Sequence, residues 1–456
     1  MKAIIDGKSI IYGDNKINID DLYTDEFYAY SNEQASKFYN DTYGVNEIFN
    51  NLIQDYLVID RWLLENKPKR VDIGKAFEKI AYLTFDICNK NGIDVTGLSI
   101  IRKIQTYIIF QAFVLSSTLY FIWLNIKISY RPGIKVSEKF AVLRSKASIK
   151  KFKNFPEIAQ EIEDPYNRDS IYRLFPVFKR IGWCMRSYIR AFKTLRSMNR
   201  FYAPLLGDSF KYSLYSFYKK RIVHTELYKQ VIEQYFSHFN GKEFYTGNNL
   251  DRYSVIEDNI ARRYNIRTYN IPHGIEYGFR FPKGFSSDVF YAHSRYTADY
   301  LNKLYETSKF VYDESIIKKM YDYGYDILHD QMVIFFTEPR DVYVNLDIIQ
   351  KLLPAMENLG EKLYLKLHPG DNKENYKNFD VEYCTDYNLS LTGNICISRK
   401  STVLLEALYN HSISLAIITT PKDNATFNQF PSLNADGIIK TYSVREMIEV
   451  IKDNLR

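Results

Sequence analysis

From residue 243 to the C-terminus, short apolar runs alternate with segments of helical periodicity. Each strand candidate is followed by a helix candidate, so consecutive strands must connect through crossovers and not through tight hairpins. This order predicts parallel sheets with helices on both faces. Two such blocks follow one another. We therefore expect an α/β protein with two Rossmann-like domains facing a cleft, preceded by a helix-rich N-terminal extension.

The expected domains follow from where the alternation begins. Residues 1–320 form an acceptor-side region, helix-rich over 1–240 and Rossmann-like over 241–320. After a linker, a C-terminal Rossmann-like domain covers 325–456. The strands expected in the two blocks are 243–247, 266–271, 288–294, 332–340, 362–371, 394–398 and 412–420. Helices are expected over 46–66, 251–264, 345–359 and 443–455, and onward from 296 and 401.

The composition fits a folded intracellular protein. With 46% hydrophobic and 16% aromatic residues, the chain has ample core-forming side chains and is not of the disordered class. Its four cysteines include no C-x-x-C pair, which argues against a zinc site or a disulfide framework. The N-terminus shows no secretory signal pattern, so we expect a cytoplasmic location.

Positive charge is concentrated in two blocks. Residues 127–153 hold nine Lys and Arg and one acid, Glu138, and residues 173–200 hold eight with no acid. Such blocks attract anionic lipid, nucleic acid or phosphorylated substrates. For either block alone, an ordinary solvated basic face is the better interpretation.

Two segments raise the question of membrane contact. Residues 104–126 contain no charge and are long enough to span a bilayer, although several polar residues interrupt them. We favour a buried core helix followed by a strand over 120–130. Residues 173–200 suit a helix that lies on an anionic membrane, and equally a helix packed on the protein's own core. If residues 173–200 lie on an anionic membrane, the protein would be peripheral at the inner membrane.

Polar residues follow three strands of the C-terminal block, at the edge where open α/β sheets bind ligands. The first group includes Glu338 and Arg340, which we assign to nucleotide binding. The second is the pair His368 and Pro369. The third is the turn before the next helix, and its predicted phosphate-binding residues are Arg399, Lys400, Ser401 and Thr402.

These residue types suit phosphate chemistry. Backbone N–H groups and hydroxyls at a helix start bind anions, and basic side chains add charge. His368 can hold a phosphate or protonate a phosphate leaving group, while Pro369 stiffens its backbone. The simpler alternatives are that Ser401 or Thr402 only caps the helix and that His-Pro is only a turn.

The motif "KLHP", followed about thirty residues later by S-x-x-S-T-x-x-x-E-A-L, resembles bacterial glycosyltransferases of the GT-B fold. It is most similar to bacterial sialyltransferases and capsule Kdo transferases, and the likeness covers about 243–456. The resemblance implies that His368, Ser401 and Thr402 contact the phosphate of a CMP-sugar. It also suggests that Glu406 reaches the nucleotide ribose, with a solvated helix carboxylate as the alternative.

The same motifs resemble, more loosely, the polyol-phosphate transferases of teichoic acid synthesis, which use a CDP-polyol. Those enzymes carry paired aromatic-His-Gly signatures, whereas this chain has "IPHG" at 271–274. That departure weakens the second resemblance.

A base for acceptor activation is harder to place. The acidic motif of the sialyltransferases has no clear copy, and the nearest candidates at strand exits are Asp251 and His273. Glu257 and Asp258 are interpreted as surface groups, and His293 as structural or lining a cleft.

The chain has no D-x-D after an apolar strand, so we expect no metal or other cofactor. Dipoles and side chains would then stabilise the departing nucleotide phosphate.

The leading hypothesis is a metal-independent glycosyltransferase of bacterial surface polysaccharide synthesis, acting on capsule, O-antigen or lipopolysaccharide. Its partners would be a nucleotide-sugar donor and a glycan or lipid-linked glycan acceptor. A CMP-linked sialic or Kdo-type acid is the expected donor. A CDP-polyol phosphotransferase and a non-catalytic glycan- or nucleic-acid-binding protein are the alternatives, and a sugar-nucleotide epimerase is a weaker one. No nucleic-acid-binding signature is present, so nucleic acid is not an expected partner.

Overall fold

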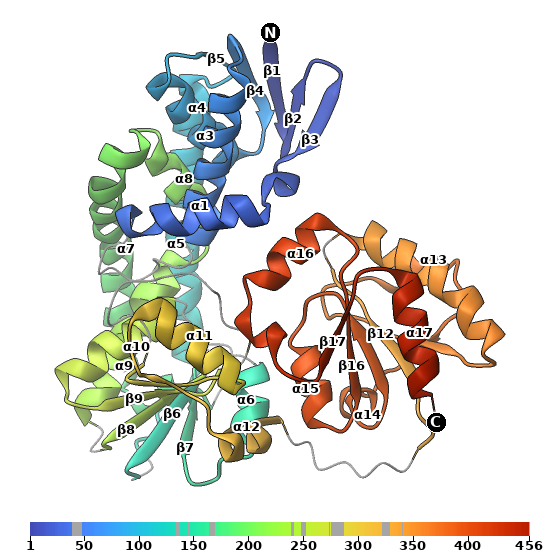
Figure 1. Ribbon diagram of the computed structural model, residues 1–456. Coiled ribbons are helices and arrows are strands. Elements are labelled where there is room, and N and C mark those ends of the chain that lie inside the picture. Colours follow the sequence, from blue (N-terminus) through green and yellow to red (C-terminus); the bar gives the residue numbers. More distant parts are fainter. Residues whose placement is uncertain are drawn as a thin grey trace. The chain divides into compact units, whose positions relative to one another are not determined.

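The chain divides into two compact units in the computed structural model (Figure 1). The first comprises Met1–Lys150, Pro156–Ile271 and Arg280–Val289, and the second comprises Lys151–Phe155, Pro272–Phe279 and Phe290–Arg456. The structure describes residues 1–38, 48–133, 137–144, 146–163, 169–238, 241–247, 252–272, 274, 287–321, 329–339 and 341–455.

The second unit contains a six-stranded sheet of order β14-β13-β12-β15-β16-β17, in which every strand pair is parallel. In chain order this is 3-2-1-4-5-6, the doubly wound arrangement. The strands are β12 (Val333–Phe336), β13 (Leu363–Lys366), β14 (Glu382–Tyr383), β15 (Ile395–Ser398), β16 (Ile413–Ile417) and β17 (Ile438–Thr441). The sheet confirms the expected α/β class.

Helices cover both faces of this sheet because successive strand residues point in opposite directions. Val333 and Phe335 pack with residues of α13 and α17, while Ile334 and Phe336 pack on the face of α15. Each fully buried side chain of this kind contributes roughly 1.5–3 kcal/mol. The helices of the unit are α11 (Arg295–Tyr305), α12 (Glu314–Tyr321), α13 (Val342–Asn358), α14 (Tyr387–Leu391), α15 (Val403–Tyr409), α16 (Pro421–Asn428) and α17 (Val444–Asn454). A short parallel pair, β10 (Val289–Tyr291) and β11 (Phe310–Val311), lies on either side of α11 in the sequence.

The first unit also contains strands, which the sequence pattern of 1–240 did not reveal. One sheet has the order β3-β2-β1-β4-β5, and β6 and β7 extend the parallel ladder of β8 and β9. The strands are β1 (Lys2–Gly7), β2 (Ser9–Tyr12), β3 (Asn15–Asn18), β4 (Arg70–Ala76), β5 (Asp94–Thr96), β6 (Lys139–Leu143), β7 (Ala159–Ile162), β8 (Glu243–Thr246) and β9 (Arg267–Asn270). The Rossmann-like sheet of this unit therefore includes strands that precede residue 241. The expected domain boundary near 320–325 stays a prediction.

Helices form most of the rest of this unit. They are α1 (Asp25–Ala35), α3 (Gln54–Asn66), α4 (Glu78–Lys90), α5 (Ile100–Lys127), α6 (Lys146–Phe152, which spans the division between the units), α7 (Val177–Leu206), α8 (Phe210–Tyr218), α9 (Ile222–His238) and α10 (Arg252–Arg263). The strand expected over 120–130 is wrong, because α5 continues as a helix to Lys127. The core-helix interpretation is also incomplete, since only one face of α5 is buried.

The end of α7 depends on a close approach to α4. Gly207 terminates α7 with φ of 99°, and a Cβ atom there would lie 2.5 Å from Cγ of Asp86. The Asp86 carboxylate accepts a hydrogen bond from the Ser209 backbone N–H at 3.1 Å. Burial raises the pKa of Asp86 to about 6, although the Ser209 hydrogen bonds act in the opposite direction.

We expect Asp86→Asn to stabilise the protein at neutral pH. The folded pKa of Asp86 lies above its usual value of 3.8, so the wild type loses stability as the pH rises from about 4 to about 6. Removing this ionisation is worth at most about 3 kcal/mol at pH 7. Melting temperatures measured from pH 4 to 8 check this, with exposed Asp94→Asn on β5 as the control. A variant no more stable than the wild type at pH 7 would contradict it.

Candidate functional site

The site lies at the carboxyl edge of the second unit's sheet, where β12 and β15 are neighbours. From β12 the chain continues to β13 on one side, and from β15 it continues to β16 on the other. In open α/β sheets, ligands bind at this point of reversal because the loops separate there. The predicted residues follow β12, β13 and β15, so the topology places all three groups along one edge.

Hydrogen bonds hold the loop that follows β13. The backbone N–H of His368 donates to Oγ1 of Thr337 at 3.1 Å, which ties this loop to the exit of β12. The N–H of Gly370 donates to Nδ1 of His368 at 3.0 Å. In the neutral imidazole, that contact assigns the proton to Nε2. His368 is exposed and presents Nε2–H as a donor, so this atom can bind an anion.

The loop is also anchored through Asp371. Its carboxylate accepts a hydrogen bond from the Tyr376 hydroxyl at 2.6 Å, and that hydroxyl accepts one from Nδ2 of Asn345 at 2.9 Å. Burial alone would raise the pKa of Asp371, but hydrogen bonds from Tyr376 and Thr337 hold it below its usual value. The histidine loop is therefore connected to helix α13, on which Asn345 lies.

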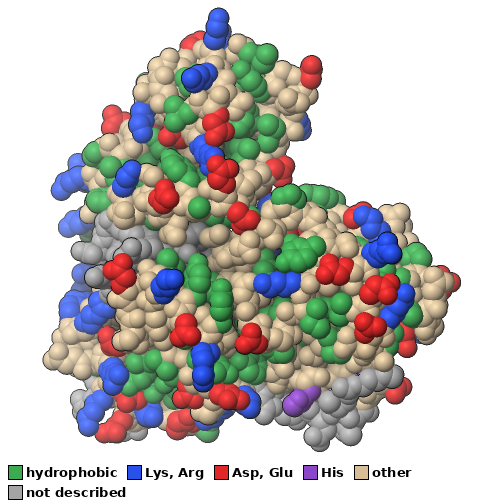
Figure 2. All heavy atoms as spheres, viewed as in Figure 1, with side chains coloured by type: hydrophobic (Ala, Val, Ile, Leu, Met, Phe, Trp, Pro, Cys, Tyr) green, Lys and Arg blue, Asp and Glu red, His purple; other side chains and the backbone are tan. Residues whose placement is uncertain are grey.

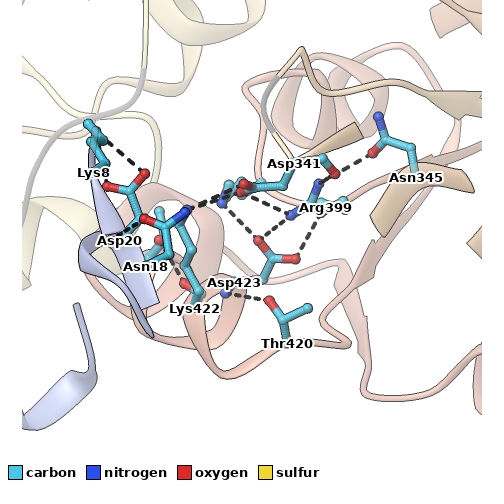
Figure 3. Close-up of polar contacts among 11 residues, drawn as sticks. Lys8, Asn18, Asp20, Asp341, Asn345, Arg399, Thr420, Lys422 and Asp423 are labelled. Carbon is cyan, nitrogen blue, oxygen red and sulfur yellow. Dashed lines mark hydrogen bonds and ion pairs between the residues drawn. The ribbon is translucent and has the colours of Figure 1, made fainter. Parts of the chain in front are cut away.

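Arg399 is almost fully buried and is bonded to Asp423 (Figure 3). Its Nε and Nη2 lie 2.8 and 2.7 Å from the two carboxylate oxygens, a bidentate pair. Nη1 also donates to Oδ1 of Asn345 at 3.3 Å. Burial opposes ionisation of Asp423, yet the hydrogen bonds from Arg399 and the charge of Lys400 lower its pKa. Arg399 thus bonds to Asp423 and Asn345, whereas the sequence predicts that it contacts a phosphate directly. That phosphate contact stays a prediction.

Lys400 and Glu338 complete the charged part of the edge. Nζ of Lys400 lies 2.8 Å from Oδ1 of Asp423. Burial raises the pKa of Glu338, and the charges of Lys400 and Arg399 only partly offset that effect. A buried carboxyl group with a raised pKa at a strand exit, close enough to two cations to feel their charge, is typical of binding and catalytic sites.

The hydroxyls after β15 are not simple helix caps. Thr402 occupies the N-cap position of α15, but its side chain makes no capping hydrogen bond. Oγ of Ser401 accepts from the Val403 N–H only at the long distance of 3.4 Å. Both residues are half-buried, so their hydroxyls remain able to bind a ligand.

A fourth strand exit contributes residues that the sequence analysis missed. Thr420, Lys422 and Asp423 follow β16, and Thr420 caps α16 by accepting from the Asp423 N–H at 3.0 Å. Lys422 pairs with Asp341 at 3.2 Å. Asp341 itself has φ of 55°, an uncommon left-handed conformation for a residue that is not glycine. The available signal was the polar sequence "TTPKD" at the end of an apolar strand.

Glu406 is more buried than we expected from the sequence, both for a residue that contacts a nucleotide ribose and for a solvated helix carboxylate. Its side chain is buried and accepts a hydrogen bond from the Tyr387 hydroxyl at 2.9 Å. The alternative of a solvated helix carboxylate is therefore wrong. The contact with a nucleotide ribose stays a prediction.

Several candidates for the acceptor side fall outside the described residues. These are Asp251 and His273, together with Arg340 of the nucleotide group. Glu257 and Asp258 are buried, so their assignment to the surface is wrong. Glu257 accepts a hydrogen bond from Thr246 at the exit of β8.

His293 has the structural role that was one of its two interpretations. It is fully buried, and its Nδ1 lies 3.0 Å from Oγ of Ser432. Its carbonyl oxygen also accepts a hydrogen bond from the Tyr409 hydroxyl at 2.8 Å.

A second polar cluster lies at the ends of β6 and β7 in the first unit. Glu163 pairs with Arg144 at 2.7 Å and with Nε2 of His224 at 2.9 Å. Burial would raise the pKa of Glu163, but His224 and Arg144 lower it to about 2. The Tyr172 hydroxyl donates to the same carboxylate at 2.9 Å. Because the carboxylate oxygens of Glu163 are bonded in this way, the cluster fits a structural role in holding the ends of β6 and β7 together.

A cavity of about 570 Å³ opens beside the fourth exit. It lies between the residues that follow β16 and β17 and residues 343–351 of α13. Its lining includes Tyr343, Thr419, Tyr442 and Arg445. The volume is within the roughly 300–1,000 Å³ usual for small-molecule sites. Among the described residues, no group of three or more His, Cys, Asp or Glu side chains could hold a metal ion.

Comparison with known proteins adds only distant structural likeness. No family model and no curated protein matches the sequence. The UDP-GlcNAc 2-epimerase of Methanocaldococcus jannaschii is 10% identical with a TM-score of 0.41, and the match covers 69% of this chain and 91% of that one. The UDP-GlcNAc 2-epimerase of Neisseria meningitidis is also 10% identical, with a TM-score of 0.39 and coverage of 69% and 90%. Scores this low do not indicate a shared activity.

We expect Asp423→Asn to destabilise the second unit by about 3–5 kcal/mol at pH 7, because it leaves the buried Arg399 without its carboxylate. The folded pKa of Asp423 lies below 3.8, so its contribution is present above that pH and is lost as the pH falls further. The difference from wild type should therefore shrink below about pH 4.

Chemical unfolding at pH 7 and at pH 3.5 tests this. Asp347→Asn on α13 is the control, because its pair with Lys351 is about half exposed and is worth roughly 0.5 kcal/mol or less. Equal effects of the two substitutions would contradict a dominant role for the buried pair.

Proposed function

We propose that this protein is a metal-independent glycosyltransferase whose second unit binds the phosphate of a nucleotide-activated sugar. The observation that carries the proposal is the set of donors along one sheet edge: Nε2–H of His368, the hydroxyls of Ser401 and Thr402, and the ammonium of Lys400. Donors of this kind bind a phosphate with charge-assisted hydrogen bonds.

Directed hydrogen bonds, more than net positive charge, would bind a phosphate at this edge. Three cations, Arg399, Lys400 and Lys422, face the carboxylates of Asp423 and Asp341 in close pairs. Arg399 is then a positioning residue, which holds Asp423 and α13 in place while its neighbours contact the ligand. The donors on His368 and on the turn after β15 supply the recognition.

The donor sugar follows from the motif resemblance. A CMP-linked sialic or Kdo-type acid has one phosphate, which suits the short row of donors, and Glu406 would reach its ribose. His368 would stabilise or protonate the departing phosphate through Nε2. A base from the acceptor side, Asp251 or His273, would take the proton of the acceptor hydroxyl.

The cavity beside β16 and β17 suits the nucleoside part of the same donor. The rings of Tyr343 and Tyr442 are exposed there, and aromatic faces stack on nucleobases. Glu338 and Arg340 remain the residues proposed to bind the nucleotide.

Thermal stabilisation by nucleotides tests the binding site. We expect one of CMP, CDP, UDP, GDP and ADP, at 100 times its dissociation constant, to add about 2.7 kcal/mol of stability. His368→Ala and the double variant Ser401→Ala/Thr402→Ala should weaken that ligand about 10- to 100-fold, because each removes hydrogen bonds to a charged group.

The matched control is His411→Asn, since His411 precedes β16 at the opposite edge of the sheet and asparagine tolerates its φ of 60°. Stabilisation that survives both site variants would place the nucleotide elsewhere. No stabilisation by any of the nucleotides would remove the support for a donor site and favour a non-catalytic binding protein.

Products identify the reaction. Incubation of CMP-sialic acid or CMP-Kdo with a glycan acceptor should release CMP and form a new glycosidic bond. A new phosphodiester from a CDP-polyol would instead establish the polyol-phosphate transferase, and would overturn the glycosyltransferase.

A further inference from the structure

Helix α5 exposes an apolar face along its whole length. Eight large hydrophobic residues, each between 42% and 62% exposed, lie along its outward side: Ile101, Ile104, Ile108, Ile109, Leu115, Leu119, Trp123 and Ile126. No charged residue interrupts the helix between Lys103 and Lys127. Soluble monomers rarely expose a contiguous apolar patch larger than a few hundred Å², so an exposed apolar stripe along a 28-residue helix is unusual.

The opposite face of α5 is built into the first unit. Phe110, Val114 and Phe121 are buried at helical spacing, and Phe110 stacks on Tyr215 of α8 with ring centroids 4.7 Å apart. Among described helices, α5 alone is long and apolar enough to cross a membrane, but only by its length and composition. Packing along one whole face instead favours a helix that stays on the protein.

Both ends of α5 are fixed to the same unit. At the start, Arg102 donates to the carbonyl oxygens of Ile73 and Ala76 at 3.2 and 2.7 Å. At the end, the fully buried Arg180 donates to the carbonyl oxygen of Ile128 at 2.7 Å. Strands of this unit both precede and follow the helix. A bilayer-spanning position would break these contacts, whereas a position along a membrane surface leaves them intact.

Helix α7 packs against α5 and also exposes apolar side chains. Phe192 of α7 contacts Phe110 of α5 with ring centroids 5.7 Å apart. Met185 and Ile189 precede Phe192 at helical spacing, so they lie along the same edge of α7. Both are more than half exposed. The helix that packs against the buried face of α5 therefore also exposes apolar side chains of its own.

Basic side chains border this surface. Arg186, Lys193, Arg196 and Arg200 are exposed on α7, which has no acidic residue. Figure 2 shows Lys and Arg side chains along the edge of the molecule where Figure 1 places α7. Exposed Lys220, which follows α8, lies 5.4 Å from the ring of Phe113 on α5.

We propose that the outward faces of α5 and α7 form a docking surface for an anionic phospholipid bilayer, with α5 lying in the plane of the headgroups. An apolar stripe with basic residues close by is the pattern of interfacial helices, which combine burial of apolar area with attraction to anionic lipid. Trp123 stands on this stripe with the ammonium of Lys127 3.5 Å from its ring centroid, a pair suited to the headgroup level. This inference is independent of the proposed function.

Intrinsic fluorescence gives a direct test. The chain has three tryptophans, and Trp62 and Trp183 are buried while Trp123 is 49% exposed. Adding vesicles of phosphatidylcholine with about 30% phosphatidylglycerol should shift the emission to shorter wavelength, and brominated lipids should quench it. Trp123→Phe should remove both changes. Vesicles of phosphatidylcholine alone should bind at least tenfold more weakly, as should anionic vesicles in high salt.

Vesicle co-sedimentation of variants locates the surface. Ile108→Glu/Leu119→Glu and Lys193→Glu/Arg196→Glu should each reduce binding to anionic vesicles at least tenfold. Leu64→Glu, at an equally exposed leucine on α3, should leave it unchanged, and circular dichroism monitors folding of every variant. Unchanged binding by the Ile108→Glu/Leu119→Glu variant would overturn the proposal. So would a wild type that binds no anionic vesicle, or a dimer in solution that Leu119→Glu dissociates.

Discussion

The buried pair of Arg399 and Asp423 is the interaction on which the edge of the second sheet depends. A guanidinium taken out of water is tolerated only with a carboxylate in good geometry, and here both oxygens of Asp423 are engaged. The pair joins the turn after β15 to the start of α16. It also reaches α13 through Asn345, and Asn345 donates to the Tyr376 hydroxyl. Three strand exits and two helices are thus held by one connected set of polar groups.

This arrangement decides how the edge can recognise an anion. Because Asp423 neutralises much of the charge of Arg399 and Lys400, the site is not a basic patch that would bind any polyanion. In the proposed function, recognition of the phosphate would depend instead on hydrogen-bond donors that the fold holds in place. The contact from Gly370 fixes the proton of neutral His368 on Nε2, and the weak capping contacts at Ser401 and Thr402 leave their hydroxyls available. Fixed donors favour one phosphate geometry over general attraction.

Local pattern predicted most of the second sheet, including β12, β13, β15 and β16 and their polar exits, because a buried parallel strand followed by a helix is visible in a few adjacent residues. It could not predict that Arg399 pairs with Asp423, since 24 residues separate them and only the assembled sheet makes them neighbours. Basic residues that the sequence suggests are available to a ligand therefore already form ion pairs within the folded protein. The strands β1 to β7 were missed for a related reason: their apolar runs are short, and they lie among long helices that dominate the composition.

For α5, the sequence predicted contacts within the protein that the structure only partly shows. Apolar length alone predicts burial, but it does not say which side of a helix the protein covers. The charge and the hydrogen-bond donors of Arg399 are paired with other residues of the chain, so a structural role explains why this residue is buried. Ile108, Leu119 and Trp123 have an apolar surface that the described structure leaves in water, and they add little to folding of the unit. Exposed apolar residues are normal one at a time, whereas a stripe along a whole helix, with basic residues close by, requires an external partner to account for it. An anionic bilayer has both the apolar interior and the negative surface that this pattern would match.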